Sequence, residues 1–156
     1  MRFTQIDRII NLEKGKSITA TKCLSLAEEY LADHFPLFPV MPGVLMLESM
    51  YQASAWLIRG SEDFANTVVL LKEARNVKYA DFVKPGQVLT VTAEIMKQDG
   101  ETTTLKASGS VDGQTAVSGR LILERFNMTD RDPASAWADA YARRKLREEF
   151  QLLYPN

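Results

Sequence analysis

Residues 33–52 read DHFPLFPVMPGVLMLESMYQ, and this stretch decides the fold because a proline-rich segment runs directly into an apolar helix former. It holds the only histidine of the chain, His34, and three of the six prolines. Proline fixes φ and restrains the residue before it, so the segment from His34 to Pro42 is predicted to be stiff, extended and non-helical. The residues that follow are strong helix formers, and the predicted helix runs from Gly43 to about Ile58.

The same stretch brings together three groups that can carry acid–base chemistry. His34 supplies an imidazole, the side chain that most often transfers protons near neutral pH. The first amides of a helix that begins at Gly43 have no partner within the helix, and they can stabilise a carbonyl oxygen. Glu48 lies within the apolar helix, where an unpaired carboxylate is costly. A lone loop histidine is as often structural as catalytic, but the combination predicts an active site.

The end of this helix is predicted at Arg59 and Gly60, a cation followed by a glycine in the place of a C-cap. Apolar residues cover nearly all faces of the helix, so other structure must surround it. Met41, Met46, Met50, Tyr51 and Trp56 are expected either in the core or lining a substrate tunnel. Phe35, Phe38 and Phe82 are interpreted as packing residues and not as a gate.

The rest of the chain predicts a sheet of antiparallel strands. Two Asp-Gly pairs between alternating runs are typical of hairpin turns. A short helical turn is expected at 25–31, with Ser25 as its N-cap. The predicted strands are Phe3 to Leu12, Ser17 to Leu24, Thr67 to Val83 with an interruption near 73–75, Val88 to Lys97, Thr102 to Val111 and Gln114 to Phe126.

Asp132-Pro133 predicts the start of a last helix that runs to about Leu153. We therefore expect two parts, a domain over 1–126 and a C-terminal helical extension over 127–156. The predicted fold class is α+β, with a long curved antiparallel sheet wrapped round a central apolar helix and an extra C-terminal helix.

Composition restricts the possible functions. With 156 residues the chain is long enough for one domain with a substantial core. A net charge of −1 gives no support for nucleic-acid binding. The single cysteine, Cys23, and the lone histidine argue against a thiolate or zinc site. No secretory signal and no membrane span are evident, so a cytoplasmic protein is expected.

With these elements in place, the sequence resembles the FabZ-type 3-hydroxyacyl-[acyl-carrier-protein] dehydratases of the hot-dog fold. The resemblance covers roughly residues 5–126, and its core is a set of ten residues at fixed spacing. The residues that carry it are His34, Phe35, Pro36, Pro39, Pro42, Gly43, Val44, Leu45, Glu48 and Gln52, with further similar segments at 6–9, 13–17 and 84–86. The family usually has glycine on either side of His-Phe-Pro, where this chain has Asp33 and Leu37.

The resemblance implies a role for each matching residue. His34 would remove the C2 proton of a 3-hydroxyacyl thioester, the Gly43 amide would hold the thioester oxygen, and Glu48 would protonate the departing hydroxyl. Gln52 lies one helical turn beyond Glu48 and is expected to orient its carboxylate. Substrate-binding roles are expected for Phe35, Pro42, Val44 and Gln52.

The expected product is a trans-2-enoyl thioester, made in fatty acid or related lipid biosynthesis without a metal or organic cofactor. The resemblance also implies two kinds of partner. One is an acyl carrier protein that delivers the thioester. The other is a second copy of the chain, in a homodimer or a trimer of dimers, because in the resembled family His34 and Glu48 would meet across the subunit interface.

Two other functions remain open at this point. Glu48 could activate water in a hot-dog thioesterase, which would release a free acid. Asp33, Leu37 and the added helix fit a non-catalytic acyl-binding or scaffold subunit. A basic run at 143–147 could dock an acidic carrier protein, although a solvated helix face balanced by Glu148 and Glu149 is the favoured interpretation. Arg75, Lys78 and Lys84 are equal candidates for that docking.

Overall fold

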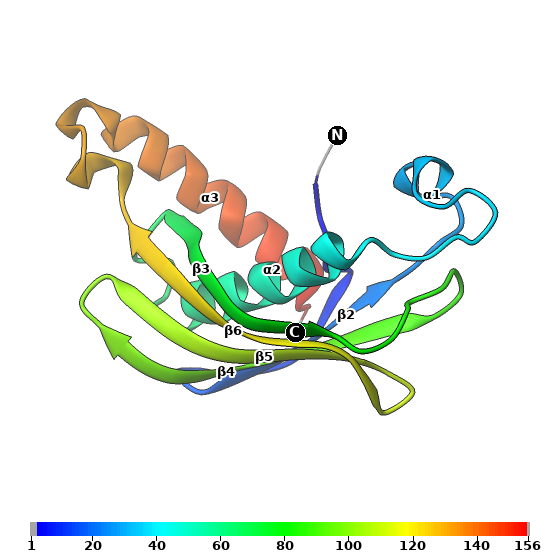
Figure 1. Cartoon of the computed structure of the whole chain (residues 1–156). Coiled ribbons are helices and arrows are strands. Elements are labelled where there is room, and N and C mark those ends of the chain that lie inside the picture. The colour runs from blue at the N-terminus through cyan, green and yellow to red at the C-terminus, as the bar shows by residue number, and fades with distance from the viewer. Residues whose placement is uncertain (1–2, 156) are drawn as a thin grey trace.

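A curved antiparallel sheet of six strands holds one long helix in its concave face in the computed structural model, which describes residues 3–155 (Figure 1). The strand order is β1-β2-β4-β5-β6-β3, so β1 and β3 are the two edges. The strands are β1 (Arg8–Glu13), β2 (Ser17–Cys23), β3 (Val68–Tyr79), β4 (Val88–Asp99), β5 (Thr102–Val111) and β6 (Gln114–Phe126). The helices are α1 (Tyr30–Asp33), α2 (Gly43–Ser61) and α3 (Ala136–Leu153), with short 3₁₀ turns at Met128–Asp130 and Pro133–Ser135.

Both Asp-Gly pairs make hairpin turns, as predicted. Gly100 and Gly113 have φ of 61° and 81°, which a glycine adopts without a steric penalty. They connect β4 to β5 and β5 to β6. The α+β hot-dog architecture predicted from the sequence is confirmed.

The core lies between α2 and the concave face of the sheet. Leu89, Val91 and Ala93 alternate along β4 and are buried against it, which is the period of a strand with one covered face. On α2 the buried residues spread over most of the circumference, including Met50 and Leu57. A helix buried on most sides needs cover beyond the sheet, and α3 provides part of it.

α3 lies across the C-terminal half of α2 (Figure 1). The ring of Phe150 is 5.9 Å from that of Trp56 and 5.4 Å from that of Phe64. The carboxylate of Asp139, 4% exposed, fixes the start of α3 by accepting hydrogen bonds from Thr67 and from Met128 and Thr129.

Within residues 3–155, no helix is long and apolar enough to cross a membrane.

The predicted end of α2 is wrong. Gly60 is not a C-cap, because the helix continues to Ser61. Gly60 is buried instead, and a Cβ there would lie 2.9 Å from Cδ1 of Leu12. The chain reverses at Asp63 and Phe64, which have positive φ of 51° and 58°. The glycine is required by packing against β1.

Three other boundaries differ from the predictions. The first strand begins at Arg8 and not at residue 3, since the segment before it turns to contact α2. The helical turn expected at 25–31 is a turn in which Ser25 Oγ accepts from the amide of Ala27, and α1 begins only at Tyr30. β3 runs through 73–75 without a break, but its pairing with β6 shifts on either side of this segment.

Candidate active site

The loop that carries His34 is non-helical, as predicted, but it is not extended throughout. Phe35 has a φ of 48°, and the amide of Phe38 donates to its carbonyl at 2.8 Å. Pro36 therefore sits at the second position of a β-turn, where its fixed φ is favourable. A positive φ just before a proline is a strained conformation of the kind that often accompanies functional loops.

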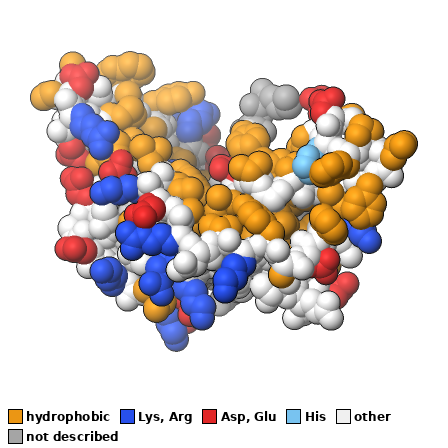
Figure 2. Space-filling view, in the orientation of Figure 1, with side chains coloured by type: hydrophobic (Ala, Val, Ile, Leu, Met, Phe, Trp, Pro, Cys, Tyr) orange, Lys and Arg blue, Asp and Glu red, His pale blue; other side chains and the backbone are white. Residues whose placement is uncertain are grey.

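His34 lines a pocket of about 260 Å³ at one end of the molecule. The side chain is half-buried and tilts against the ring of Phe35, with 4.6 Å between ring centroids. The other lining residues come from the loop, the start of α2 and the segment after β3: Phe35, Val40, Met41, Gly43, Met46, Tyr79, Ala80, Asp81 and Phe82. Figure 2 shows hydrophobic side chains gathered around the single histidine on this face.

The N-terminus of α2 opens into the same pocket. The amides of Leu45 and Met46 both donate to the carbonyl of Pro42, the N-cap residue. Among residues 3–155, the amides of Gly43 and Val44 have no such partner. A Cβ on Gly43 would lie 3.0 Å from the ring of Tyr79, so glycine also lets the helix end approach β3. The pocket thus combines an imidazole with free helix amides.

Glu48 lies in a different pocket of the same chain. That pocket, of about 190 Å³, is lined by one stripe of α2 together with Thr4 and Leu146. Gln52 Nε2 donates to Oε1 of Glu48 at 2.9 Å, and Gln52 is held in turn by Phe3 and Gln5. The orienting contact expected of Gln52 is therefore present, while His34 and Glu48 do not share a pocket within one subunit.

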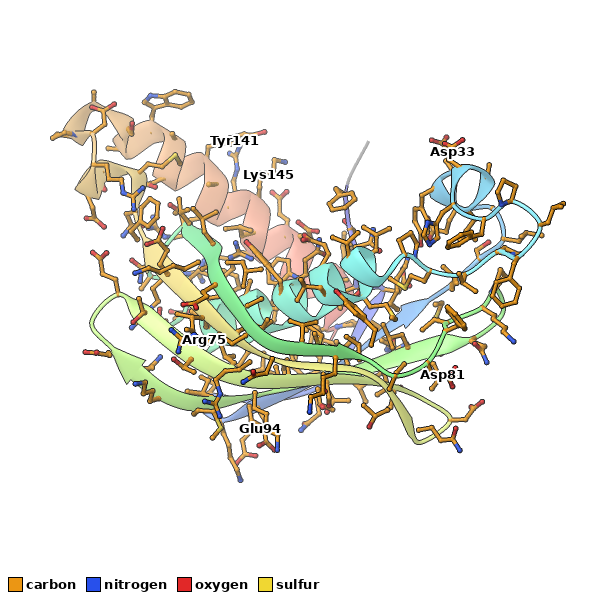
Figure 3. The ribbon with its side chains drawn as sticks, viewed as in Figure 1. Asp33, Arg75, Asp81, Glu94, Tyr141 and Lys145 are labelled. Carbon is orange, nitrogen blue, oxygen red and sulfur yellow. The ribbon has the colours of Figure 1, made fainter. Side chains whose placement is uncertain are left out.

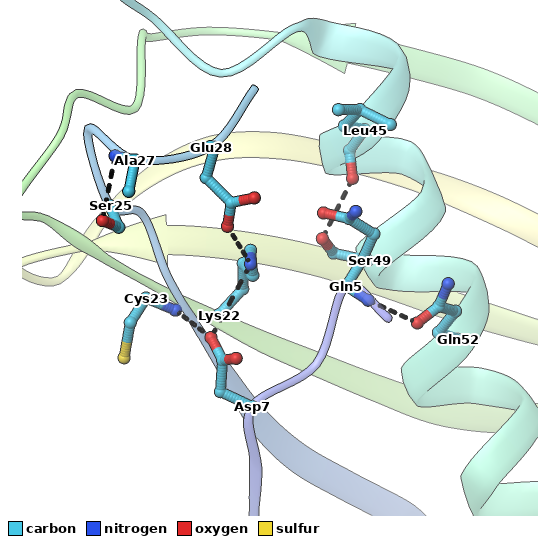
Figure 4. A network of polar contacts seen from close by, with 10 residues as sticks. All are labelled: Gln5, Asp7, Lys22, Cys23, Ser25, Ala27, Glu28, Leu45, Ser49 and Gln52. Carbon is cyan, nitrogen blue, oxygen red and sulfur yellow. Dashed lines mark hydrogen bonds and ion pairs between the residues drawn. The ribbon is translucent and has the colours of Figure 1, made fainter. Parts of the chain in front are cut away.

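A buried ion pair anchors the segment that leads to His34. Lys22 Nζ lies 2.7 Å from Oε1 of Glu28, and the Lys22 side chain is only 5% exposed (Figure 4). Asp7 adds a second, more distant carboxylate at 3.9 Å and accepts from the amide of Cys23. Nearby, burial and the charges of Glu28 and Asp7 raise the pKa of Tyr30 to about 12. The ion pair therefore holds the turn that precedes α1 against strand β2.

Other predicted residues are more exposed than expected. Phe35, Phe38 and Phe82 were interpreted as packing residues, but they are 61%, 48% and 54% exposed. Phe38 and Phe82 contact each other edge to face at 5.5 Å beside the pocket. Val44, a predicted substrate-binding residue, is 66% exposed and points out of the monomer. These side chains form an apolar surface around the site.

Sequence reasoning missed one wall of the His34 pocket. Tyr79, Ala80 and Asp81 follow the end of β3, and the amides of Ala80 and Asp81 donate to the carbonyl of Ala116. Asp81 lies at the same end of the molecule as Asp33 (Figure 3). The approach of this segment to α2 depends on the fold of the whole sheet, so no local pattern indicates it.

Comparison with known proteins agrees with this geometry. The profile of a family described as the FabA-like domain matches residues 1–120. The chain belongs to the FabA-like family. Two relatives are each called 3-hydroxyacyl-[acyl-carrier-protein] dehydratase FabZ. The one from Janthinobacterium sp. (strain Marseille) is 38% identical over 83% of this chain and 85% of its own length. The one from Levilactobacillus brevis is 40% identical over 74% of this chain and 78% of its own length.

Solved structures of other proteins share the fold of this FabA-like chain. The dehydratase heterocomplex ApeI:P from Xenorhabdus doucetiae matches with a TM-score of 0.67 and 22% identity, over 85% of this chain and 90% of that one. The PaaI protein of E. coli matches with a TM-score of 0.58 and 15% identity, over 76% of this chain and 78% of its own. These likenesses concern the fold alone.

Proposed function

We propose that the protein is a 3-hydroxyacyl-[acyl-carrier-protein] dehydratase, which removes water from a (3R)-3-hydroxyacyl thioester to give the trans-2-enoyl thioester. The observation that carries the proposal is the pocket that His34 lines together with Gly43, the first residue of α2. The identity of 38–40% with FabZ proteins over most of the chain supports the same reaction. The proposed pathway is fatty acid or related lipid biosynthesis.

The chemistry requires three groups in one site. His34 accepts the C2 proton, and the electron pair left on C2 moves toward the thioester carbonyl. The Gly43 amide then stabilises the negative charge on the carbonyl oxygen, and one such donor is worth roughly 3 kcal/mol in a transition state. Glu48 delivers a proton to the C3 hydroxyl, which leaves as water. Phe35 and Pro42 shape the entry on the His34 side.

The separation of His34 and Glu48 within one chain supports a homodimer with shared sites. β3 is an edge strand whose outer backbone groups are unpaired in the monomer, and edge strands are natural pairing surfaces. Leu70 and Tyr79 on this strand, with Val44 beside its end, are 44%, 51% and 66% exposed. In the proposed dimer, β3 pairs with its symmetry mate, and His34 of one subunit faces Glu48 of the other.

The direct test is a mass-spectrometric assay of the purified protein with 3-hydroxyacyl and 2-enoyl thioesters on carrier protein. The wild type should interconvert them with a change of one water, and His34→Ala and Glu48→Gln should each abolish this. Release of free acid would indicate a hot-dog thioesterase instead. An intact dimer with neither product would favour a non-catalytic acyl-binding subunit.

A further inference from the structure

Cations stand directly opposite one another on the convex face of the sheet. The strand registers place Lys106 of β5 opposite Arg120 of β6, and Arg120 opposite Arg75 of β3. All three are exposed, and directly opposed residues in antiparallel strands have Cβ atoms about 5 Å apart on the same face. We call these three residues the cationic row.

The charge of the row is greatest at its centre. Glu73 binds Arg75 at 2.7 Å, and Glu94 of β4 stands opposite Lys106. Arg120 has a cation on each side and no ion pair with any residue from 3 to 155. Like charges in directly opposed positions destabilise a sheet, so folding alone gives no reason for Arg120. The row therefore indicates a function that requires positive charge.

More cations surround the row. Two shallow hollows of about 330 and 280 Å³ meet at Arg120. Their linings hold six cations and two acids, although the net charge of the whole chain is −1. The cations are Lys72, Arg75, Lys78, Lys97, Lys106 and Arg120. Figure 2 shows Lys and Arg side chains gathered over this side of the molecule, and Figure 3 shows Glu94 on the face away from α2.

The row is close to the candidate active site. Lys78 in the first hollow directly precedes Tyr79, which lines the His34 pocket. From Arg75 to Tyr79 the strand advances about 13 Å, at about 3.3 Å per residue. A macromolecule bound at the row would therefore lie at most about 13 Å along β3 from Tyr79, and a substrate carried on a flexible tether could span that distance.

We propose that the cationic row is the docking surface for the acidic carrier protein that delivers the acyl chain. The proposal rests on the proposed function, which supplies an acidic partner, and on charge complementarity with the six cations. The basic run of α3 is a weaker candidate, because two of its three arginines are used within the fold. Arg143 donates to the carbonyl of Phe64, and Arg147 contacts Asp63. Lys145 pairs with Glu148.

The test compares three variants with the wild type. The first is Arg120→Gln, and the second is a double variant that combines Lys106→Glu and Arg120→Glu. The third is the control Arg144→Glu, at an exposed position of α3. Each is assayed with the same 3-hydroxyacyl group on carrier protein and on a small pantetheine-like thioester. We expect KM for the carrier-borne substrate to rise about tenfold in Arg120→Gln and a hundredfold in the double variant, while the small substrate is unaffected. The control should match the wild type, and added salt should raise KM for the carrier in the wild type.

Stability provides an independent readout. Because Arg120→Gln removes like-charge contacts on both sides, its Tm should rise by about 1–3 °C while carrier affinity falls. An unchanged KM for the carrier substrate in the double variant, with wild-type circular dichroism, would overturn the proposal. So would a larger effect of Arg144→Glu, or binding of anionic vesicles or DNA at the row without binding of carrier.

Failure of the proposed function gives a different result. If wild-type protein dehydrated neither substrate, the docking surface would still be tested by titrating labelled apo carrier protein into the wild type and the double variant. Loss of binding only in the double variant would support the row. Equal binding by both would reject it.

Discussion

Gln52 Nε2 lies 2.9 Å from Oε1 of Glu48, one turn earlier in α2. The same amide group also donates to the carbonyl of Phe3, and its oxygen accepts from the amide of Gln5 at 2.7 Å. Gln52 is thus held from the N-terminal segment while it holds the carboxylate. Because Phe3 and Gln5 hold the amide group of Gln52 in place, this amide holds the carboxylate of Glu48 in one orientation.

We predict that Gln52→Glu lowers kcat about tenfold or more with little change in KM. The new carboxylate keeps the size of glutamine and can still accept from Gln5, but it cannot donate to Glu48, and a hydrogen bond to a charged group is worth about 1.5–3 kcal/mol. Steady-state kinetics on a 3-hydroxyacyl thioester would measure this. Gln151→Glu, on exposed α3, is the matched control. Wild-type kcat in Gln52→Glu would show that the contact has no catalytic role.

Mixing two inactive variants would test the shared site. His34→Ala and Glu48→Gln homodimers should each be inactive. Unfolding and refolding them together should give heterodimers in which one site has both wild-type residues, so about a quarter of wild-type activity should return if subunits pair at random. Separate refolding of each variant is the control. If both groups acted from one chain, the mixture would remain inactive.

The local part of this fold could be predicted and the non-local part could not. β5 and β6 were predicted to the residue because the Asp-Gly turns and the alternation beside them are local signals. Gly60 was misinterpreted because its role is set by Leu12, 48 positions earlier in the chain. A glycine after a cation is typical of a helix end, and only the packed structure shows otherwise.

The candidate site divides in the same way. The spacing of Glu48 and Gln52, one helical turn apart, was sufficient to predict their contact, while the catalytic roles of His34, Gly43 and Glu48 stay predictions. The pocket wall near Tyr79 depends on where β3 ends relative to α2, which is a property of the sheet. The cationic row could not be predicted either, because the strand registers decide which cations lie directly opposite one another.

Gly109→Ala should destabilise the sheet. The added Cβ would lie 2.8 Å from Cδ1 of Leu89 and 2.9 Å from Cγ1 of Val117, and both side chains are fully buried. Overpacking of a well-packed core typically costs about 1–3 kcal/mol. Denaturant unfolding would measure the loss. Val117→Ala removes one of these two close contacts, so the double variant should be more stable than the sum of the single effects predicts, and strict additivity would contradict the steric explanation.

The anchor of α3 should depend on pH through Asp139. Burial alone would raise the pKa of this carboxyl, but hydrogen bonds from Thr67, Thr129 and Met128 outweigh it and lower the pKa to about 2 from 3.8. A lowered pKa in the folded state means that the stabilisation is complete above about pH 4 and is lost as the pH falls toward 2.

We therefore expect Asp139→Asn to lower Tm at pH 7 and to have a smaller effect as the pH approaches 2, because the wild type loses its charged acceptor there. The amide cannot accept at both of its end atoms, so the variant leaves some of these donors without a partner. Thermal unfolding from pH 2 to pH 7 would measure both proteins, with Asp132→Asn, at the exposed turn before α3, as the matched control. A Tm difference that stays constant across this range would show that α3 is held by packing of its apolar face and not by the carboxylate.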